Sequence, residues 1–300
     1  MGFIATLIAK PQSQALDPDI VRDVSTAILG LETNWLSQNE AVDIAFDGDA
    51  NDHDQIDYVE AMLRSVIGYR PIDIAVQNPN GRCKKLLIAD MDSTMIEQEC
   101  IDELAAMVGV KDQVSAITRR AMNGEIAFEP ALRERVALLK NLPANIVQNV
   151  IAERITLMPG GKILVKTMRA NGAFCALVSG GFTSFTAPIA AMLGFDDNRA
   201  NILNINNDLL SGTVAEPILG MQAKVEALEF YANKLGLTSA EAIAVGDGAN
   251  DLGMIKRAGT GVALHAKPAV AAEAKIRIDH ADLTALLFIQ GYARNEFSAA

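Results

Sequence analysis

The sequence predicts an α/β protein, with a Rossmann-like parallel sheet in its larger part and a smaller α+β domain before it. The chain has 300 residues, which is enough for two domains. Half of the residues are hydrophobic and only 5% are aromatic, a composition that suits helices packed on a parallel sheet. The hydrophobic pattern also changes along the chain, from alternating runs near the N-terminus to continuous apolar runs separated by helical patterns.

Residues 1–80 show the order β-α-β-β-α-β when a poorly marked strand near Trp35 is counted, and this order is the ferredoxin-like arrangement. Strands are expected at 3–9, near Trp35, at 41–46 and at 71–77, and helices from Asp17 to Leu29 and at 54–69. The stretch NPNGR (78–82) follows and has the composition of a linker. We therefore expect a flexible joint near residue 80, with few contacts across it.

The second part of the chain, 84–300, has the pattern of a parallel α/β domain. Its strand candidates are KLLIAD (85–90), AFCALVS (173–179), EAIAVGD (241–247) and TGVAL (260–264). Residues 101–155 show only helical patterns. A helical block is therefore expected as an insertion after the first strand of the sheet.

Charge and cysteine content narrow the function classes. A net charge of −11 repels phosphate backbones and argues against a nucleic-acid partner. Three cysteines without a CxxC spacing (Cys83, Cys100, Cys175) argue against a disulfide framework or a zinc site. No apolar run approaches the roughly 18 residues of a membrane span. A signal peptide requires a basic residue before its apolar run, and none precedes the first apolar run of this sequence. We expect a cytoplasmic protein without a membrane partner.

Three of the predicted strands end in polar residues, at 90–92, 179–181 and 247–251. In an open parallel sheet, ligands bind beyond the carboxyl ends of the strands, so these clusters should meet at one rim. A single cluster is explained as well by a solvated loop or a helix N-cap. Three clusters at one rim predict a functional site.

Four aspartates, Asp90, Asp92, Asp247 and Asp251, would concentrate negative charge at this rim. Such a concentration costs free energy unless a cation neutralises it. Mg²⁺ is suitable because a few carboxylates and a substrate phosphate can hold it together. Of Asp90 and Asp92, one carboxylate could attack phosphorus, while the other could protonate the leaving oxygen and then deprotonate water.

Two further groups could contact a phosphate. Ser179 and the amides around Gly180 could donate hydrogen bonds to it. Lys224, near the start of a predicted helix, could neutralise the remaining charge, although its spacing alone favours a solvated surface lysine.

The motifs DMDST, VSGGF, Lys224 and GDGANDLGM resemble, in this order, the four signature motifs of the haloacid dehalogenase superfamily of phosphotransferases. The resemblance covers about residues 84–290 and is closest to the phosphoserine phosphatases. Residues 120–143 are similar to the helical cap of those enzymes, which implies a cap at about 101–155. The resemblance implies Mg²⁺-dependent hydrolysis of O-phospho-L-serine through an aspartyl-phosphate, the last step of serine biosynthesis.

The resemblance also implies roles for individual residues. Asp90 corresponds to the nucleophile and Asp92 to the general acid and base. The implied Mg²⁺ ligands are Asp90, Asp92 through its backbone carbonyl, and Asp247, with Asp251 behind them. The implied phosphate contacts are Ser179, Gly180, Lys224 and Asn250. Glu99 corresponds to the residue near the substrate ammonium, Arg135 to the one that binds its carboxylate, and Met122 and Phe128 to an apolar lid.

Residues 1–80 are similar to ACT domains, which implies regulation or self-association as a homodimer. Two other functions stay open. A phosphotransferase could pass the phosphoryl group to another hydroxyl, which the sequence cannot distinguish from transfer to water. A non-catalytic protein that senses amino acids is disfavoured because the acidic, serine and lysine motifs are intact.

Overall fold

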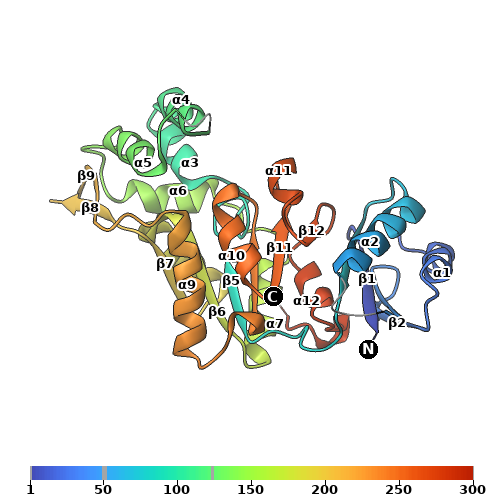
Figure 1. Ribbon diagram of the computed structural model, residues 1–300. Helices are drawn as coiled ribbons and strands as arrows, with labels where there is room; N and C mark the ends of the chain where they lie inside the picture. Colours follow the sequence, from blue (N-terminus) through green and yellow to red (C-terminus); the bar gives the residue numbers. More distant parts are fainter. Residues whose placement is uncertain (1, 49–52, 123–124, 300) are drawn as a thin grey trace.

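The computed structural model of the protein describes residues 2–48, 53–122 and 125–299, without the side chains of residues 53, 54 and 122. The N-terminal domain lies at one end, the parallel sheet with its helices in the middle, and a group of helices at the other end (Figure 1). In this described part of the chain, no helix is both long and apolar enough to cross a membrane.

The N-terminal domain has the predicted β-α-β-β-α-β order. Its elements are β1 (Phe3–Ala9), α1 (Pro18–Ala27), β2 (Glu32–Ser37), β3 (Ala41–Phe46), α2 (His53–Ile67) and β4 (Ile72–Gln77). The strands form an antiparallel sheet in the order β2-β3-β1-β4. Asp17 begins α1, because its side chain accepts hydrogen bonds from the N–H groups of Asp19 and Ile20. The ferredoxin-like arrangement predicted from the sequence is therefore observed.

The larger domain contains a six-stranded sheet in the order β12-β11-β10-β5-β6-β7, and every strand pair is parallel. Its strands are β5 (Leu86–Ala89), β6 (Phe174–Phe182), β7 (Asp197–Asn201), β10 (Ala242–Gly246), β11 (Thr260–Leu264) and β12 (Ile276–Ile278). The four strands predicted from apolar runs are β5, β6, β10 and β11. The two edge strands, β7 and β12, escaped the prediction because one is polar and the other has three residues.

Helices cover both faces of this sheet. They are α7 (Gly161–Ala170), α8 (Thr183–Leu193), α9 (Met221–Lys234), α10 (Leu252–Arg257) and α12 (Ala285–Ile289). A short helix, α11 (Pro268–Ala271), follows β11. Short 3-10 turns are η1 (Ser239–Glu241), η2 (Ala249–Asp251) and η3 (Arg294–Glu296). Successive residues of β5 face opposite sides, since Leu87 packs in the cluster with α7, α8 and α12, and Ile88 in the cluster with α9.

The helical block predicted after the first strand of the sheet is observed, and we refer to it as the cap. It consists of α3 (Cys100–Met107), α4 (Lys111–Met122), α5 (Phe128–Ala137) and α6 (Ile146–Arg154). An unpredicted hairpin, β8 (Leu203–Asn206) and β9 (Leu209–Val214), reaches the cap from the sheet domain. Asn141 donates its N–H to the carbonyl of Leu210, and Leu210 donates its own to the carbonyl of Leu142, both at 2.8 Å. Backbone hydrogen bonds therefore join the cap to the hairpin of the sheet domain.

Polar contacts join the N-terminal domain firmly to the sheet domain, so the expectation of few contacts across residues 78–82 is wrong. Both carboxylate oxygens of Asp73, on β4, accept hydrogen bonds from the backbone N–H groups of residues 279–281, at 2.8 to 3.2 Å. Burial raises the pKa of Asp73, and these three N–H groups oppose the shift. Within the linker, Arg82 forms an ion pair with Asp43 of β3 at 2.5 Å.

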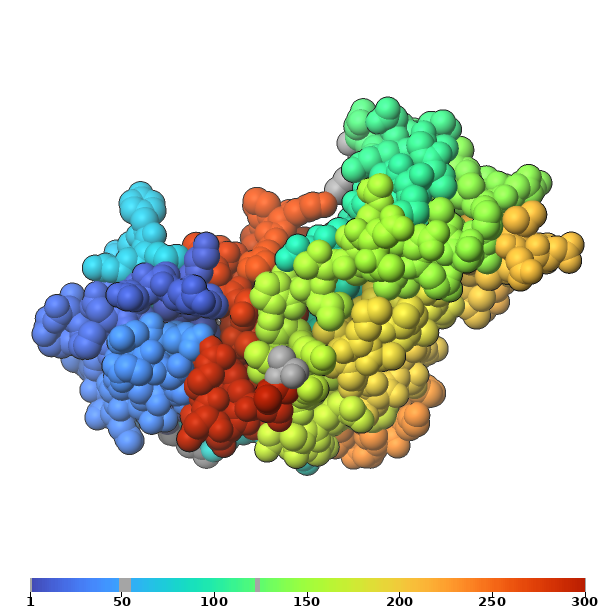
Figure 2. Space-filling view, turned by 180° about the vertical axis from the view of Figure 1, so that it is seen from behind, coloured from blue at the N-terminus to red at the C-terminus, as the bar shows by residue number. Residues whose placement is uncertain are grey.

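Apolar packing continues this interface. Side chains of the N-terminal sheet belong to the same buried cluster as α12, namely Ile8, Leu36, Ala41 and Ala75. Figure 2 shows the blue N-terminal domain lying directly against the red C-terminal residues. One face of the N-terminal sheet is thus covered by its own helices and the other by the sheet domain, a relation that alternating runs such as 71–77 do not reveal.

Candidate active site

Three neighbouring strands bring the predicted site residues to one rim of the sheet. Asp90 follows the last residue of β5, and Asp247 follows the last residue of β10. Ser179 and Gly180 lie near the end of β6, on the other side of β5. The predicted meeting of the three polar clusters is therefore observed, and they line a cavity of about 390 Å³.

The cavity lining contains most of the residues named from the sequence: Asp90, Asp92, Glu99, Phe128, Arg135, Ser179, Gly180, Asp247 and Asn250. Lys224 and Asp251 lie beneath Asp90, in contact with the site but not at its surface. Met122 is the last residue of α4, and its side chain lies outside the described part of the structure.

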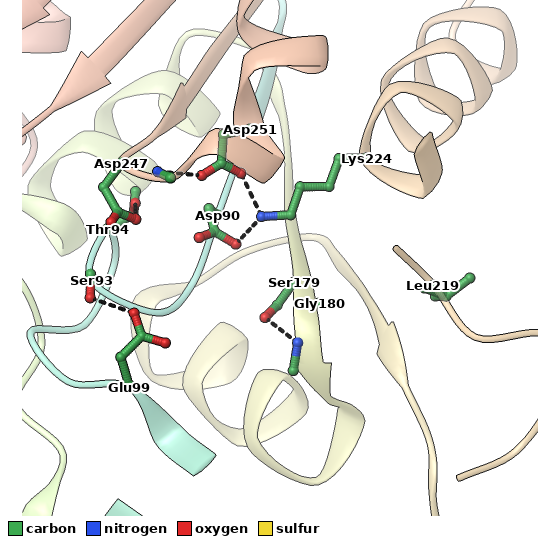
Figure 3. Close-up of polar contacts among 12 residues, drawn as sticks. Asp90, Ser93, Thr94, Glu99, Ser179, Gly180, Leu219, Lys224, Asp247 and Asp251 are labelled. Atoms are coloured by element: carbon green, nitrogen blue, oxygen red, sulfur yellow. Dashed lines mark hydrogen bonds and ion pairs between the residues drawn. The ribbon is translucent and has the colours of Figure 1, made fainter. Parts of the chain in front are cut away.

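A buried lysine connects two of the aspartates (Figure 3). Lys224 Nζ donates to Asp90 Oδ1 and to Asp251 Oδ1, both at 2.5 Å. Burial by itself lowers the pKa of Lys224, but the charges of Asp90 and Asp251 outweigh burial and raise it. Burial and the charge of Asp251 raise the pKa of Asp90, and Lys224 opposes that rise. Lys224 is therefore a structural cation of the site and not the surface lysine that its spacing favoured.

Asp251 reaches this position because residue 246 is a glycine. A Cβ atom on Gly246 would lie only 2.3 Å from the carboxyl carbon of Asp251. The second oxygen of Asp251 accepts the N–H of Gly248 at 3.0 Å. Both carboxylate oxygens of Asp251 are thus engaged by protein groups, which suits the place behind the metal ligands that the resemblance implies.

The acidic cluster has the donor set of a hard cation. Carboxylate oxygens of Asp90, Asp247 and Asp251 lie within 4.8 Å of one another. Burial, followed by the charge of Asp251, raises the pKa of Asp247 to about 6, and the hydroxyl of Thr94 donates to its Oδ1 at 3.2 Å. Burial and neighbouring charges disfavour the ionised forms of Asp90 and Asp247. A cation that prefers oxygen ligands, bound by the carboxylates, would stabilise the ionised form.

Asp92 lines the same cavity. Its Oδ1 accepts the backbone N–H of Cys100 at 2.9 Å. Burial, followed by the charge of Glu99, raises the pKa of Asp92 to about 7. A Cβ atom on Gly181 would lie 3.2 Å from Asp92 Oδ2 and 3.1 Å from Ser179 Oγ, so the glycine lets both groups approach the same space. A carboxyl group with this pKa can act as both acid and base near neutral pH.

The remaining wall of the cavity comes from the cap. Glu99, just before α3, accepts the hydroxyl of Ser93 at 2.9 Å. Arg135, on α5, donates from Nε to the carbonyl of Ala131 at 3.3 Å, and burial lowers its pKa. The ring of Phe128 covers Gly180, where a Cβ atom would lie 3.5 Å from it. The cap thus places one acidic, one basic and one aromatic side chain over the aspartates.

Three further residues belong to this site and were not predicted. Thr94 orients Asp247, and the backbone of Cys100 orients Asp92. Lys267, directly before α11, lines the cavity. Thr94 was detectable from its place directly after the DxDS sequence, whereas Lys267 lies in a segment without a recognisable motif.

The site agrees with comparisons to known proteins. A sequence model described as haloacid dehalogenase-like hydrolase matches residues 84–259. Phosphoserine phosphatase SerB2 of Mycobacterium tuberculosis is 39% identical, with 81% of this chain and 59% of that protein covered. The Haemophilus influenzae phosphoserine phosphatase is 46% identical, with coverages of 67% and 64%. The chain thus spans about 60% of the length of these two relatives. The Lactococcus lactis phosphoserine phosphatase is 44% identical and is covered over 99% of its length.

Solved structures give the same relationship. A probable phosphoserine phosphatase from Vibrio cholerae has a TM-score of 0.77 at 32% identity, covering 98% of this chain and 88% of that one. A hydrolase of the haloacid dehalogenase family from Salmonella enterica serovar Typhi has a TM-score of 0.85 at 27% identity, covering 97% and 98%. Both similarities include the N-terminal domain. With a matching family model, relatives well above 30% identity and the same fold, the chain belongs to the haloacid dehalogenase-like hydrolases.

Proposed function

We propose that the protein is a Mg²⁺-dependent phosphatase that hydrolyses O-phospho-L-serine to L-serine and phosphate, the last step of serine biosynthesis. The observation that carries this proposal is the lining of one cavity. It combines the aspartates, Ser179 and Gly180 with Glu99 and Arg135 of the cap. These groups complement the phosphate, the ammonium and the carboxylate of phosphoserine. The relatives named phosphoserine phosphatase support the same substrate.

In the proposed reaction, Asp90 is the nucleophile. Lys224 holds its Oδ1, so we assign the attack on phosphorus to Oδ2. The new bond is an aspartyl-phosphate, and the bond from phosphorus to the serine oxygen breaks as Asp92 gives that oxygen its proton. Asp92 then accepts a proton from a water molecule that attacks the same phosphorus, which releases phosphate and restores Asp90.

Other residues bind the substrate in this proposal. Ser179, the N–H of Gly180 and Asn250 bind the phosphate oxygens from the cavity wall. Lys224, buried behind Asp90, is assigned to the phosphate through its positive charge. Glu99 faces the ammonium and Arg135 the carboxylate, while Met122 and Phe128 form an apolar lid. Each of these groups acts by orientation and charge, which lowers the barrier when it favours the transition state more than the bound substrate.

The metal proposed for the site is Mg²⁺. Asp90 and Asp247 would bind it through carboxylate oxygens and Asp92 through its backbone carbonyl, with Asp251 behind them. A bound Mg²⁺ supplies a Lewis acid that withdraws charge from the phosphoryl oxygens. Phosphate release should stop in EDTA and return with excess Mg²⁺; full activity in excess chelator would contradict this part.

Arg135→Ala is the test of substrate identity. A hydrogen bond to a charged group contributes about 1.5–3 kcal/mol, which corresponds to roughly 10- to 150-fold in kcat/KM. The loss should occur with phosphoserine and be small with p-nitrophenyl phosphate, which has no carboxylate. Arg133→Ala is the matched control, because Arg133 lies on the same helix and pairs at the surface with Glu216. Equal losses on both substrates would refute the role of Arg135.

The proposal extends to the assembly and location of the protein. β2 is an edge strand of the N-terminal sheet, whereas the opposite edge strand, β4, faces β12. An exposed edge strand can pair with a second copy of itself, which supports a homodimer formed through residues 1–80. Sedimentation of the full chain tests this, and a monomer at assay concentration would contradict it. The small phosphorylated substrate and the unpaired cysteines support a cytoplasmic location.

A further inference from the structure

A bulge in β6 forms the loop that carries Ser179. The ladder between β6 and β7 runs regularly to the pair Val178 and Arg199 and resumes at the pair Phe182 and Asn201. Three residues of β6, 179–181, therefore stand opposite one residue of β7. A bulge of this kind removes backbone groups from the ladder, and each buried one needs another partner.

The side chain of Asn201 supplies that partner. Its Nδ2 donates to the carbonyl of Gly180 at 2.9 Å and to the carbonyl of Leu219 at 3.1 Å. Its Oδ1 accepts the N–H of Leu219 at 2.7 Å. The amide is 2% exposed, and the Leu219 N–H fixes which end is oxygen, so Nδ2 must face Gly180.

The orientation of the Gly180 carbonyl determines which hydrogen bond the hydroxyl oxygen of Ser179 accepts. In a trans peptide the carbonyl of Gly180 and the N–H of Gly181 point in opposite directions. With the carbonyl held by Asn201, the N–H of Gly181 points to Ser179 Oγ and donates to it at 2.8 Å (Figure 3). Because Ser179 Oγ already accepts this hydrogen bond, its own proton is available for an acceptor in the cavity.

We infer that Asn201 is a positioning residue for the phosphate site, which acts through the peptide of Gly180 and Gly181 to direct the hydroxyl of Ser179 toward the phosphate. The inference rests on the proposed phosphatase function. Asn201 is not among the described residues that line the cavity, so its effect on phosphate must pass through the loop 179–181, whose side-chain donor is the hydroxyl of Ser179. Its link to Leu219, two residues before α9, also holds the amide in the required orientation.

Asn201→Asp tests the inference with little change of shape. The carboxylate keeps an acceptor for the N–H of Leu219 but places oxygen lone pairs against the carbonyls of Gly180 and Leu219. We expect a loss of about 10- to 150-fold in kcat/KM for p-nitrophenyl phosphate, the range for a lost hydrogen bond to a charged group. Asn198→Asp is the control: it lies on the same strand, accepts the hydroxyl of Thr186 at 2.7 Å, and keeps that acceptor when substituted. The kcat/KM of Asn198→Asp for p-nitrophenyl phosphate should stay within about twofold of the wild-type value.

A double-mutant cycle separates this role from a general effect on folding. If Asn201 acts through Ser179, then Asn201→Asp should change activity by less than about threefold in a Ser179→Ala background. The affinity for inorganic phosphate in the presence of Mg²⁺, measured by calorimetry, should follow the same pattern. Equal losses in both backgrounds would overturn the inference. Unfolding of both Asn201→Asp and Asn201→Ser would also overturn it, because Asn201 would then serve the fold.

The double-mutant cycle uses p-nitrophenyl phosphate and therefore does not require phosphoserine to be the substrate. If the wild type hydrolyses p-nitrophenyl phosphate but not phosphoserine, the proposed substrate fails and the cycle still measures the role of Asn201. If it hydrolyses neither compound, the phosphate-binding measurements decide, and equal phosphate affinity in wild type and Asn201→Asp would overturn the inference.

Discussion

Replacing Lys224 with methionine should destabilise the protein strongly, and more so at pH 8 than at pH 5. The side chains of Lys224, Asp90 and Asp251 are 2%, 7% and 0% exposed, so water cannot replace the lysine. Methionine has a similar length but no charge. The substitution therefore leaves two buried carboxylates without their cation.

The magnitude follows from the two bonds that are lost. Each hydrogen bond between charged groups contributes about 1.5–3 kcal/mol, so the pair contributes about 3–6 kcal/mol. Breaking a buried ion pair by removing one partner costs a similar amount, about 3–5 kcal/mol. Without Lys224, the pKa of Asp90 in the folded state rises further above its unfolded value. The folded variant then binds protons more readily than the unfolded chain, so lowering the pH recovers part of the lost stability.

Urea unfolding at pH 5 and pH 8, followed by circular dichroism, measures this effect. The free energy of unfolding should fall by about 3–5 kcal/mol at pH 8 and by less at pH 5, and Mg²⁺ should reduce the difference at pH 8. Lys84→Met is the matched control, because Lys84 is also buried but donates to the carbonyl of Ala240 at 2.8 Å. The decrease in the free energy of unfolding caused by Lys84→Met should not depend on Mg²⁺. A loss for Lys224→Met that is equal at both pH values, or below about 1 kcal/mol, would refute the reasoning.

Two further predictions concern the domain interface and the proton donor. Asp73→Ala should lower the free energy of unfolding by about 1–3 kcal/mol, because the N–H groups of residues 279–281 lose their acceptor; an unchanged urea midpoint would contradict this. In the proposed mechanism the protonated form of Asp92 gives the proton, so kcat/KM for phosphoserine should fall as pH rises through about 7. Glu99→Gln removes a charge that raises this pKa and should move the fall to lower pH, whereas Glu97→Gln should leave it in place; no movement with Glu99→Gln would count against Asp92 as the donor.

Much of the fold was predictable because buried strands and amphipathic helices have distinct hydrophobic periods. The strands β5, β10 and β11 are continuous apolar runs, and residues 41–46 and 71–77 of the N-terminal domain alternate. The edge strand β7 was not predictable, since its sequence DNRAN is polar and gains its structure only by pairing with β6. The same holds for the domain contacts, where Asp73 finds partners 206 to 208 residues away.

The candidate site was also predictable only in part. Asp90, Ser179 and Asp247 were predictable as neighbours because parallel strands end at one rim. Sequence spacing gave no sign that Lys224 is buried between two carboxylates, because the partner Asp251 is 27 residues away. Asn201 could not be found either, since it lies in the polar edge strand and acts on a bulge that only the strand register reveals.

The covalent intermediate on Asp90 decides whether the proposed mechanism is right. Enzyme mixed with ³²P-labelled phosphoserine and Mg²⁺ can be quenched in acid within one turnover and mapped by proteolysis and mass spectrometry. We expect an acid-stable, hydroxylamine-labile label on the peptide that contains Asp90, and neither label nor turnover in Asp90→Asn checked for deamidation. Label on another residue, or substantial turnover by Asp90→Asn, would contradict the mechanism.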